Sequence, residues 1–372
     1  MTKYVYAFEE GSKEQKFLLG GKGANLAEMT NLGLPVPPGF TISTDACKAY
    51  MAGGDAMPDG LMIEVAAART ALEAKMDKTL GDANDPLLVS VRSGAAFSMP
   101  GMMDTVLNLG LNDESVKGLA KQTNNERFAY DSYRRFVQMF GKIVLDIPGD
   151  LFEEALHDLV EEKGLNVETE LRAADLASLV ETFKGIVKKE AGVDFPTDPT
   201  EQLAYAIEAV FKSWNGRRAK DYRKLEGISD DLGTAVNVQT MVFGNKGDDS
   251  GTGVAFTRNP SSGENTPYGD FLTNAQGEDV VAGIRITEPL DAMGNDFPEC
   301  HKQLLDVMSL LENHYRDMCD IEFTIEQGRL FMLQTRVGKR TAAAALRMAV
   351  EMEQEGLIDA REAVLRVQPA QL

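Results

Sequence analysis

Apolar and polar residues alternate in a stretch near the C-terminal end of the chain, and this period of two predicts a β-hairpin. Alternate residues of its first strand share an apolar face: Ile321, Phe323 and Ile325. We expect a three-residue loop, Glu326–Gly328, because glycine readily supplies the left-handed conformation that such a loop needs. This loop would pair Asp320 with Gln334 and Phe323 with Phe331.

The polar face of the predicted hairpin then carries four side chains: Asp320, Glu322, Gln334 and Arg336. Carboxylate and amide oxygens are ligands that Mg²⁺ accepts, and an arginine guanidinium contacts phosphate oxygens well. These side chains therefore suit a metal–phosphate complex. They suit the solvent-facing side of an edge hairpin equally well, so both interpretations remain open from this stretch alone.

The pattern changes twice along the rest of the chain. Up to about residue 111, short apolar runs typical of strands are mixed with helical patterns. From 112 to about 189, helical periodicity replaces them and predicts an all-helical insertion. After Thr234 strand patterns return, at 235–243, 251–258, 268–274 and 279–283. Helices are predicted at 298–318, 341–355 and 359–367.

Composition narrows the class of protein. The length of 372 residues predicts more than one domain or lobe. The hydrophobic content of 43% and the mean hydropathy of -0.22 are typical of a soluble globular protein. The formal net charge of -20 argues against a general nucleic-acid or anionic-membrane surface, although Mg²⁺ and local basic residues could still accommodate a nucleotide. The three cysteines lack a CxxC spacing, which favours a reducing cytoplasm over a disulfide framework.

Lys22 lies in a glycine-rich turn, Gly20–Gly23, at the start of a predicted helix. Small residues let backbone N–H groups approach an anion, and the beginning of a helix adds positive potential. The stretch is not a Walker A motif, because the G-x-x-x-x-G-K-[ST] pattern is not matched. Taken alone, it fits an exposed lysine in a turn as well as a phosphate site.

Arg92 ends a predicted buried strand, 86–92, and opens a glycine- and methionine-containing loop, 93–104. Strand ends that lead into glycine loops often carry ligand-binding groups, and an arginine there can hold a phosphate. A salt-bridged arginine at a strand end is the structural alternative. Three methionines of the loop suit a hydrophobic core as well as an adenine ring: Met99, Met102 and Met103.

Six motifs resemble, in the same order, the N-terminal nucleotide-binding region of the pyruvate, phosphate dikinase family. They are Leu19–Met29, Val89–Gly94, Ser98–Asp104, Gly253–Pro260, Asn274–Gly283 and Asp320–Arg336. The resemblance covers essentially the whole chain. The related phosphoenolpyruvate synthase shares the themes around Lys22, Arg92, Asp320 and Glu322. The loop Ser98–Asp104 resembles the phosphate-using dikinase and differs from the water-using synthase.

The resemblance implies an α+β protein with an ATP-grasp fold, in which an all-helical insertion interrupts two β-containing lobes. The first lobe would comprise 1–111 and 198–243, the latter ending in an adenine-facing linker. The insertion would be 112–197, and the second lobe with its metal-binding hairpin 244–340. Residues 341–372 would form a helical linker toward a phosphohistidine domain.

The resemblance also implies roles for single residues. Catalytic roles would belong to Lys22, Arg92 and Arg336. The Mg²⁺ ligands would be Asp320, Glu322 and Gln334. The nucleotide site would comprise Lys22, Arg92, Gly101, Gln239, Met241, Val242, Thr252, Glu278 and Gln334. Two of these, Gly101 and Thr252, are expected in loops that close over the phosphates.

The family converts ATP, phosphate and pyruvate reversibly into AMP, diphosphate and phosphoenolpyruvate, and a mobile domain carries a phosphorylated histidine between two sites. None of His157, His301 and His314 matches that histidine, so we expect this chain to bind Mg-ATP without completing the reaction. The implied partners are ATP or AMP, phosphate or diphosphate and the phosphohistidine domain, within a cytoplasmic homodimer. The alternatives are the same domain of phosphoenolpyruvate synthase, or a non-catalytic nucleotide-binding module.

Overall fold

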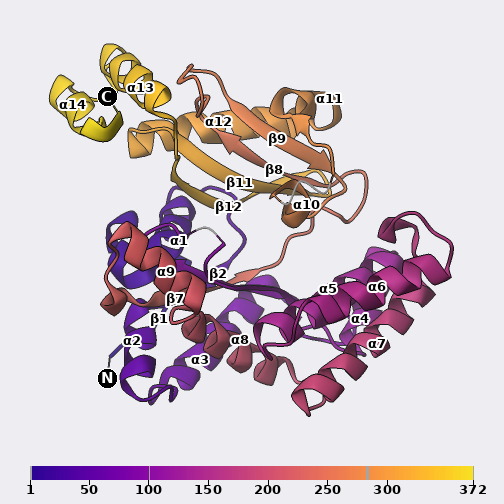
Figure 1. The fold of residues 1–372 in the computed structure, drawn as a ribbon. Helices are drawn as coiled ribbons and strands as arrows, with labels where there is room; N and C mark the ends of the chain where they lie inside the picture. The colour runs from indigo at the N-terminus through magenta and orange to yellow at the C-terminus, as the bar shows by residue number, and fades with distance from the viewer. Residues whose placement is uncertain (1, 100, 282–284, 372) are drawn as a thin grey trace. The chain divides into compact units, whose positions relative to one another are not determined.

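The computed structural model describes residues 2–99, 101–281 and 285–371, and the chain divides into two compact units. The first unit comprises Met1–Glu28 and Pro38–Met241, and the second comprises Met29–Pro37 and Val242–Leu372. Each unit has its own five-stranded sheet and its own helices (Figure 1). The chain is therefore an α+β protein, as predicted.

The sheet of the first unit has the order β1–β2–β7–β5–β6, and every neighbouring pair is antiparallel. Its strands are β1 (Val5–Ala7), β2 (Gly39–Ile42), β5 (Val89–Ala95), β6 (Thr105–Leu109) and β7 (Thr234–Thr240). A separate parallel pair consists of β3 (Thr79–Leu80) and β4 (Pro86–Leu87). Strand β6 was not predicted, because it directly follows the methionine-containing loop and is short.

Nine α-helices accompany this sheet in the described part of the first unit. They are α1 (Lys16–Asn31, whose last residues belong to the second unit), α2 (Thr44–Ala52), α3 (Leu61–Met76), α4 (Ser115–Thr123), α5 (Glu126–Ile143), α6 (Asp150–Glu162), α7 (Ala173–Ala191), α8 (Pro199–Ser213) and α9 (Arg217–Glu226). Helix α8 packs against β5, β6 and β7. The basic helix α9 was not predicted, because it lacks a clear apolar stripe.

Helices α4–α7 fill the segment that was predicted to be all-helical and form one group in Figure 1. The Asn125 side chain accepts a hydrogen bond from the Phe128 backbone N–H and so caps the beginning of α5. The rings of Phe136 and Phe140 meet Phe195 edge to face, with centroids 5.5 and 5.3 Å away. This aromatic cluster holds α5 against the segment that closes the insertion.

The sheet of the second unit has the order β10–β9–β8–β11–β12 and is also antiparallel throughout. Its strands are β8 (Gly251–Phe256), β9 (Tyr268–Thr273), β10 (Glu288–Pro289), β11 (Cys319–Glu326) and β12 (Arg329–Val337). Helix α12 (Pro298–Tyr315) packs against β11 and β12. On the buried side of the sheet, Phe271 and Phe323 stack with their rings 2° from parallel.

The remaining helices of the second unit are α10 (Gly277–Val281), α11 (Met293–Asp296), α13 (Ala342–Gln354) and α14 (Ala360–Arg366). The strand predicted at 279–283 is wrong for its described part, because Gly277–Val281 is helical and the backbone N–H of Gln276 donates to the Asp279 carboxylate. Helix α13 packs onto the unit through a small core: Met318, Ala344, Met348, Met352 and Ile358.

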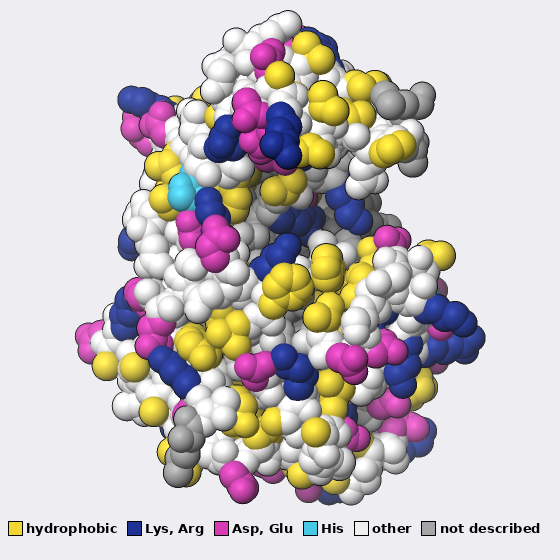
Figure 2. All heavy atoms as spheres, turned by 90° about the vertical axis from the view of Figure 1, so that its left-hand side faces the viewer, with side chains coloured by type: hydrophobic (Ala, Val, Ile, Leu, Met, Phe, Trp, Pro, Cys, Tyr) yellow, Lys and Arg dark blue, Asp and Glu magenta, His cyan; other side chains and the backbone are white. Residues whose placement is uncertain are grey.

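The surface carries charges of both signs. Figure 2 shows acidic, basic and hydrophobic side chains interspersed on the face it presents, so this face is not a single acidic patch despite the net charge of -20. The three cysteines are free thiols and are buried. In the described part of the chain, no helix combines the length and the hydrophobicity needed to cross a membrane.

Candidate functional site

The hairpin β11–β12 has a different loop from the predicted one. Its turn contains two residues, Gln327 and Gly328, whose φ angles of 49° and 72° are typical of a tight hairpin turn with two left-handed positions. As a result, Phe323 pairs with Met332, and the predicted pairing with Phe331 is wrong. The extra residue expected in the loop lies elsewhere in the hairpin.

A β-bulge at Leu333 shifts the register between Phe323 and Glu322. Beyond the bulge, Glu322 pairs with Gln334 and Asp320 pairs with Arg336. Paired residues of neighbouring strands share one face of the sheet. The hairpin therefore brings the two carboxylates, the amide and the guanidinium to one face, although the predicted pairing of Asp320 with Gln334 is wrong.

Asp320 and Arg336 form an ion pair on this face, because the Arg336 Nε donates to the Asp320 Oδ2 at 2.7 Å. Burial raises the pKa of Asp320 above its ordinary value, the neighbouring Glu322 raises it further, and Arg336 lowers it. The net direction is upward, so loss of solvation outweighs the ion pair. A bound divalent cation would favour the ionised carboxylate and oppose this shift.

Among the described residues, no three His, Cys, Asp or Glu side chains gather into a metal-binding group. The hairpin offers two carboxylates and the amide of Gln334 instead. Magnesium at nucleotide sites is usually held by one or two carboxylates, with water and phosphate oxygens completing its shell. The ligand set on the hairpin therefore fits Mg²⁺ that arrives with a nucleotide better than Mg²⁺ held by protein alone.

Thr252 does not lie in a loop, which corrects the prediction. It lies within β8, where its Oγ1 donates to the Phe323 carbonyl at 3.0 Å and lies 3.2 Å from the Thr324 Oγ1. The glycines on either side serve packing: a Cβ at Gly251 would lie 2.6 Å from the Phe271 ring, and a Cβ at Gly253 would lie 2.6 Å from the Phe323 ring. Glycine here allows close contact with aromatic rings and does not indicate a mobile loop.

In the first unit, the glycine-rich turn brings Lys22 to the end of β5. Gly20 has φ 68° and ψ 164°, a conformation open almost only to glycine, and it kinks α1. A Cβ at Gly20 would lie 1.8 Å from the Gly94 carbonyl oxygen, so the two backbones touch. A Cβ at Gly94 would lie 3.4 Å from the Lys22 Cβ. Lys22 and the strand that carries Arg92 are therefore neighbours.

Arg92 is half-buried in β5, next to β7 on one side and β6 on the other. Its carbonyl accepts a hydrogen bond from the Asn237 Nδ2 at 3.5 Å, and the Asn237 Oδ1 accepts one from the Thr41 Oγ1 at 2.9 Å. These contacts fix the backbone that presents the guanidinium. Pro100, in the following loop, lies outside the described residues.

Two residues of α9 hold the loop after β5, and sequence reasoning missed both. The Arg218 Nη1 donates to the Gly101 carbonyl at 3.4 Å, and the Tyr222 hydroxyl donates to the Ser98 carbonyl at 3.4 Å. Gly101 is exposed with φ 69°, whereas Met99 is buried. A backbone carbonyl that meets a side chain far along the chain leaves no local pattern, so no sequence signal would have revealed these contacts.

The remaining predicted residues lie in β7, in the segment that follows it, and in α10. Gln239 is buried in β7, between Gly39 and Ser90 of the neighbouring strands. Met241 follows β7, and its backbone N–H donates to the Leu88 carbonyl at 2.9 Å. Val242 begins the second unit's main segment. Glu278 lies in α10, and its side chain falls outside the described residues.

Comparison with known proteins identifies the family. The model of the pyruvate phosphate dikinase AMP/ATP-binding domain matches residues 16–59, 55–291 and 297–357. The chain belongs to this family. Pyruvate, phosphate dikinase of Clostridium symbiosum is 55% identical over 373 residues, which is 100% of this chain and 43% of that protein. The chloroplastic enzyme of Flaveria trinervia is 55% identical over 374 residues, or 100% and 39%.

The chloroplastic pyruvate, phosphate dikinase 1 of Zea mays is 56% identical over 363 residues, which is 98% of this chain and 38% of that protein. The chain therefore spans about two fifths of the length of these relatives. Of the six motifs that carry the resemblance, the first three lie in the first unit except for Met29, and the other three lie in the second.

Proposed function

We propose that this chain binds Mg-ATP and positions its phosphates for transfer, as part of the reaction ATP + phosphate + pyruvate = AMP + diphosphate + phosphoenolpyruvate. The observation that carries the proposal is the polar face of β11–β12, where two carboxylates, an amide and a guanidinium meet in a chain of the dikinase family. An ATP-grasp fold, with the helical insertion inside its first lobe, is part of this proposal.

Asp320, Glu322 and Gln334 would hold Mg²⁺, and their oxygens fit its preference for hard ligands. When bound, Mg²⁺ supplies charge neutralisation to the phosphate oxygens. Arg336 is paired with Asp320 and so fixes the direction of that carboxylate. Its remaining guanidinium N–H groups are in place to contact a phosphate oxygen on the same face.

Lys22 and Arg92 would contact the phosphates from the first unit. The Gly20 kink fixes the start of the helix that carries Lys22, and the Asn237 amide fixes the strand that carries Arg92. Both are cations on backbone elements with little freedom, which suits a transfer that depends on positioning more than on covalent chemistry. We also propose that Gly101 lies close to the phosphates.

The other nucleotide contacts follow the resemblance. Gln239, Met241 and Val242 would face adenine, because they form the end of β7 and the segment after it. Glu278 would lie near the nucleotide. Thr252 would contribute from within β8, through a position that is already hydrogen-bonded to the neighbouring strand.

Calorimetric titration of the chain with Mg-ATP tests the proposal. Arg92→Ala and Glu322→Ala each remove a charged contact, and we expect each to weaken binding by about 10-fold to 100-fold. Matched controls are Arg361→Ala and Glu353→Ala, which remove the same side chains from exposed positions of α14 and α13. Unchanged affinity in both site variants, or no binding by the unmodified chain, would refute the proposal.

The dikinase reaction differs from the synthase reaction in its second phosphoryl acceptor, which is phosphate in one and water in the other. The relatives from Clostridium symbiosum, Flaveria trinervia and Zea mays are named pyruvate, phosphate dikinase, and this favours the phosphate-using reaction. A full-length protein with this chain should therefore require inorganic phosphate to form phosphoenolpyruvate. Formation at an undiminished rate without phosphate would favour the synthase instead.

A further inference from the structure

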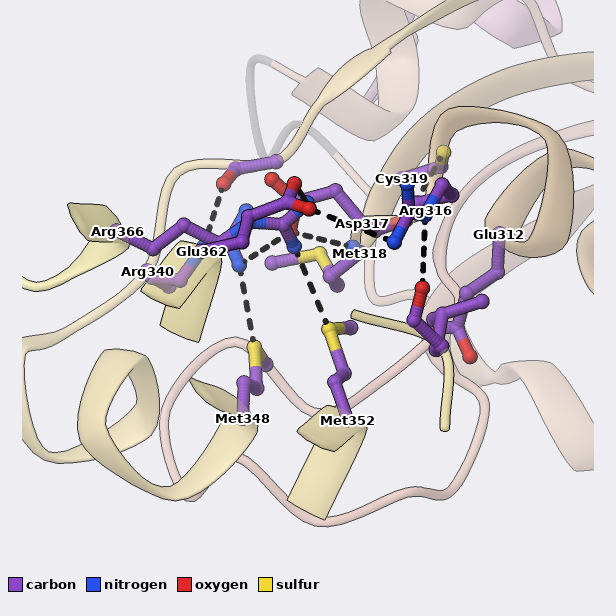
Figure 3. Close-up of polar contacts among 12 residues, drawn as sticks. Glu312, Arg316, Asp317, Met318, Cys319, Arg340, Met348, Met352, Glu362 and Arg366 are labelled. Atoms are coloured by element: carbon purple, nitrogen blue, oxygen red, sulfur yellow. Dashed lines mark hydrogen bonds and ion pairs between the residues drawn. The ribbon is translucent and has the colours of Figure 1, made fainter. Parts of the chain in front are cut away.

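The second unit contains a pocket of about 400 Å³ that the proposed nucleotide chemistry does not use. The end of β12, helix α13 and the segment after α14 line it. Figure 3 shows the polar contacts around it, with Arg340 and Arg366 on one side and Met348 and Met352 of α13 on another. Its walls therefore differ in chemistry.

One wall is cationic. Asp317 accepts from the Arg340 Nη1 at 2.7 Å, and the same oxygen lies 3.5 Å from the Arg366 Nη1 (Figure 3). Lys339 also lines the pocket. Three cations thus face a single lining carboxylate, and this local excess of positive charge lies in a chain with a net charge of -20. Glu362 is not part of the lining, but its ion pair with Arg366 offsets part of this positive charge.

Besides their contacts with the carboxylates of Asp317 and Glu362, both guanidiniums make weak contacts with thioether sulfurs. The Arg340 Nη1 lies 3.5 Å from the Met348 Sδ, and the Arg366 Nη1 lies 3.7 Å from the Met352 Sδ (Figure 3). A thioether sulfur is only a weak acceptor. An incoming oxyanion would therefore offer the N–H groups at these sulfurs stronger, charge-assisted hydrogen bonds than the thioethers do.

The apolar part of the lining consists of small or flexible side chains: Val337, Ala345, Met348, Ala349 and Met352. Alanines leave room in the pocket, and methionines adapt to the shape of a bound group. A pocket that only joined two helices would be expected to balance its charges and to be filled by larger side chains.

We propose that this pocket binds a small organic dianion, with its oxyanion head between Arg340 and Arg366 and its apolar body against α13. A phosphoryl group and a pair of carboxylates offer the same head chemistry. The site is separate from the polar face of the hairpin, and no residue of the proposed nucleotide site lines it. The proposal therefore stands or falls independently of the proposed function.

The test is calorimetric titration of the 372-residue chain with benzylphosphonate and benzylmalonate, which carry the same apolar body on different dianionic heads. Inorganic phosphate is the comparison without an apolar body. Every titration contains saturating Mg-ATP, so that the proposed nucleotide site is occupied and does not contribute. We expect at least one organic probe to bind, at least tenfold more tightly than inorganic phosphate.

Two variants assign the binding to the pocket. Arg366→Gln removes one cation and should weaken the organic probe by about 10-fold to 100-fold, whereas Arg361→Gln, at an exposed position of the same helix, should not. Ala349→Leu fills the pocket without changing its charge and should also weaken the probe. It keeps the test decisive if circular dichroism shows that Arg366→Gln fails to fold.

The titrations have results that support the proposed site and results that refute it. Binding of either organic probe that both pocket variants weaken supports the site, and the preferred probe identifies the head group. The proposal is overturned if neither organic probe binds, if inorganic phosphate binds as tightly as the better one, or if Ala349→Leu leaves affinity unchanged. Mg-ATP affinity, measured separately in the same variants, should not change.

Discussion

Arg258 gives the sharpest prediction about what holds the candidate site in place. Its side chain is 1% exposed and lies just after β8. Its Nε and Nη2 both donate to the Glu312 carboxylate of α12 at 3.0 Å, and its Nη1 and Nη2 both donate to Glu355, beside the end of α13. One guanidinium therefore joins two helices to the sheet that carries the polar hairpin face.

Replacing Arg258 with methionine keeps an apolar stem and removes all four hydrogen bonds. Breaking a buried ion pair by removing one partner typically costs about 3–5 kcal/mol, because the other charge is left buried. Glu312 stays 14% exposed, whereas the Glu355 side chain is 39% exposed and water can solvate it. We therefore expect a loss of about 3 kcal/mol in the second unit, at the lower end of that range.

Hydrogen exchange measures this loss locally. A loss of about 3 kcal/mol corresponds to more than about 100-fold faster exchange of the most protected amides in β8 and β11. Fluorescence of Trp214, the single tryptophan of the chain and buried in the first unit, follows that unit separately. Arg258→Lys is the matched control, because it keeps the positive charge but not the planar guanidinium. It should lose less stability than Arg258→Met.

Lowering the pH should reduce the difference in stability between the unmodified protein and the Arg258→Met variant. The hydrogen bond from Arg258 lowers the pKa of Glu355, so this contact stabilises the fold above the ordinary glutamate pKa and is lost as the pH falls through the lowered value. In the methionine variant this dependence weakens, because only the hydrogen bond from the Asn265 side chain still lowers the pKa of Glu355. At neutral pH, amide exchange rates of β8 and β11 in Arg258→Met could instead stay within about threefold of those in the unmodified protein. That result would show that the ion-pair network contributes little to stability and would refute the reasoning from burial.

Two further predictions concern the candidate site. Gly20→Ala should weaken Mg-ATP binding at least tenfold by calorimetry, because the methyl group would overlap the Gly94 carbonyl and displace the backbone before Lys22; full affinity with an unchanged melting temperature would contradict the contact. The apparent Mg²⁺ affinity at fixed ATP should fall as the pH drops through the raised pKa of Asp320, because protons compete with the cation there. Asp320→Asn should lower the affinity and remove this pH dependence, and an equal pH dependence in both proteins would assign it to another group.

The polar face of the hairpin was predictable because it depends only on the alternation of side chains between the two faces of a β-strand. A three-residue loop adds one residue to the turn, and the bulge at Leu333 adds one residue to β12. Either addition places Gln334 and Arg336 on the face of the carboxylates, since both change the register by one. The alternation of apolar residues reveals this parity, but it does not show where the extra residue lies, so the pairing of Phe323 was predicted wrongly.

Glycines were the least reliable guide, because their role depends on residues far along the chain. The Gly251–Gly253 stretch looks like a loop that could close over phosphates, yet both glycines lie in β8 beneath the rings of Phe271 and Phe323. Only the register of three strands brings those rings to the glycines. The Thr252 hydroxyl is consequently bonded to the sheet, so a contact with a phosphate would have to break its hydrogen bond to the Phe323 carbonyl. The polar face of β11–β12 needs no such rearrangement, and its residues are therefore the stronger candidates for the first contact with Mg-ATP.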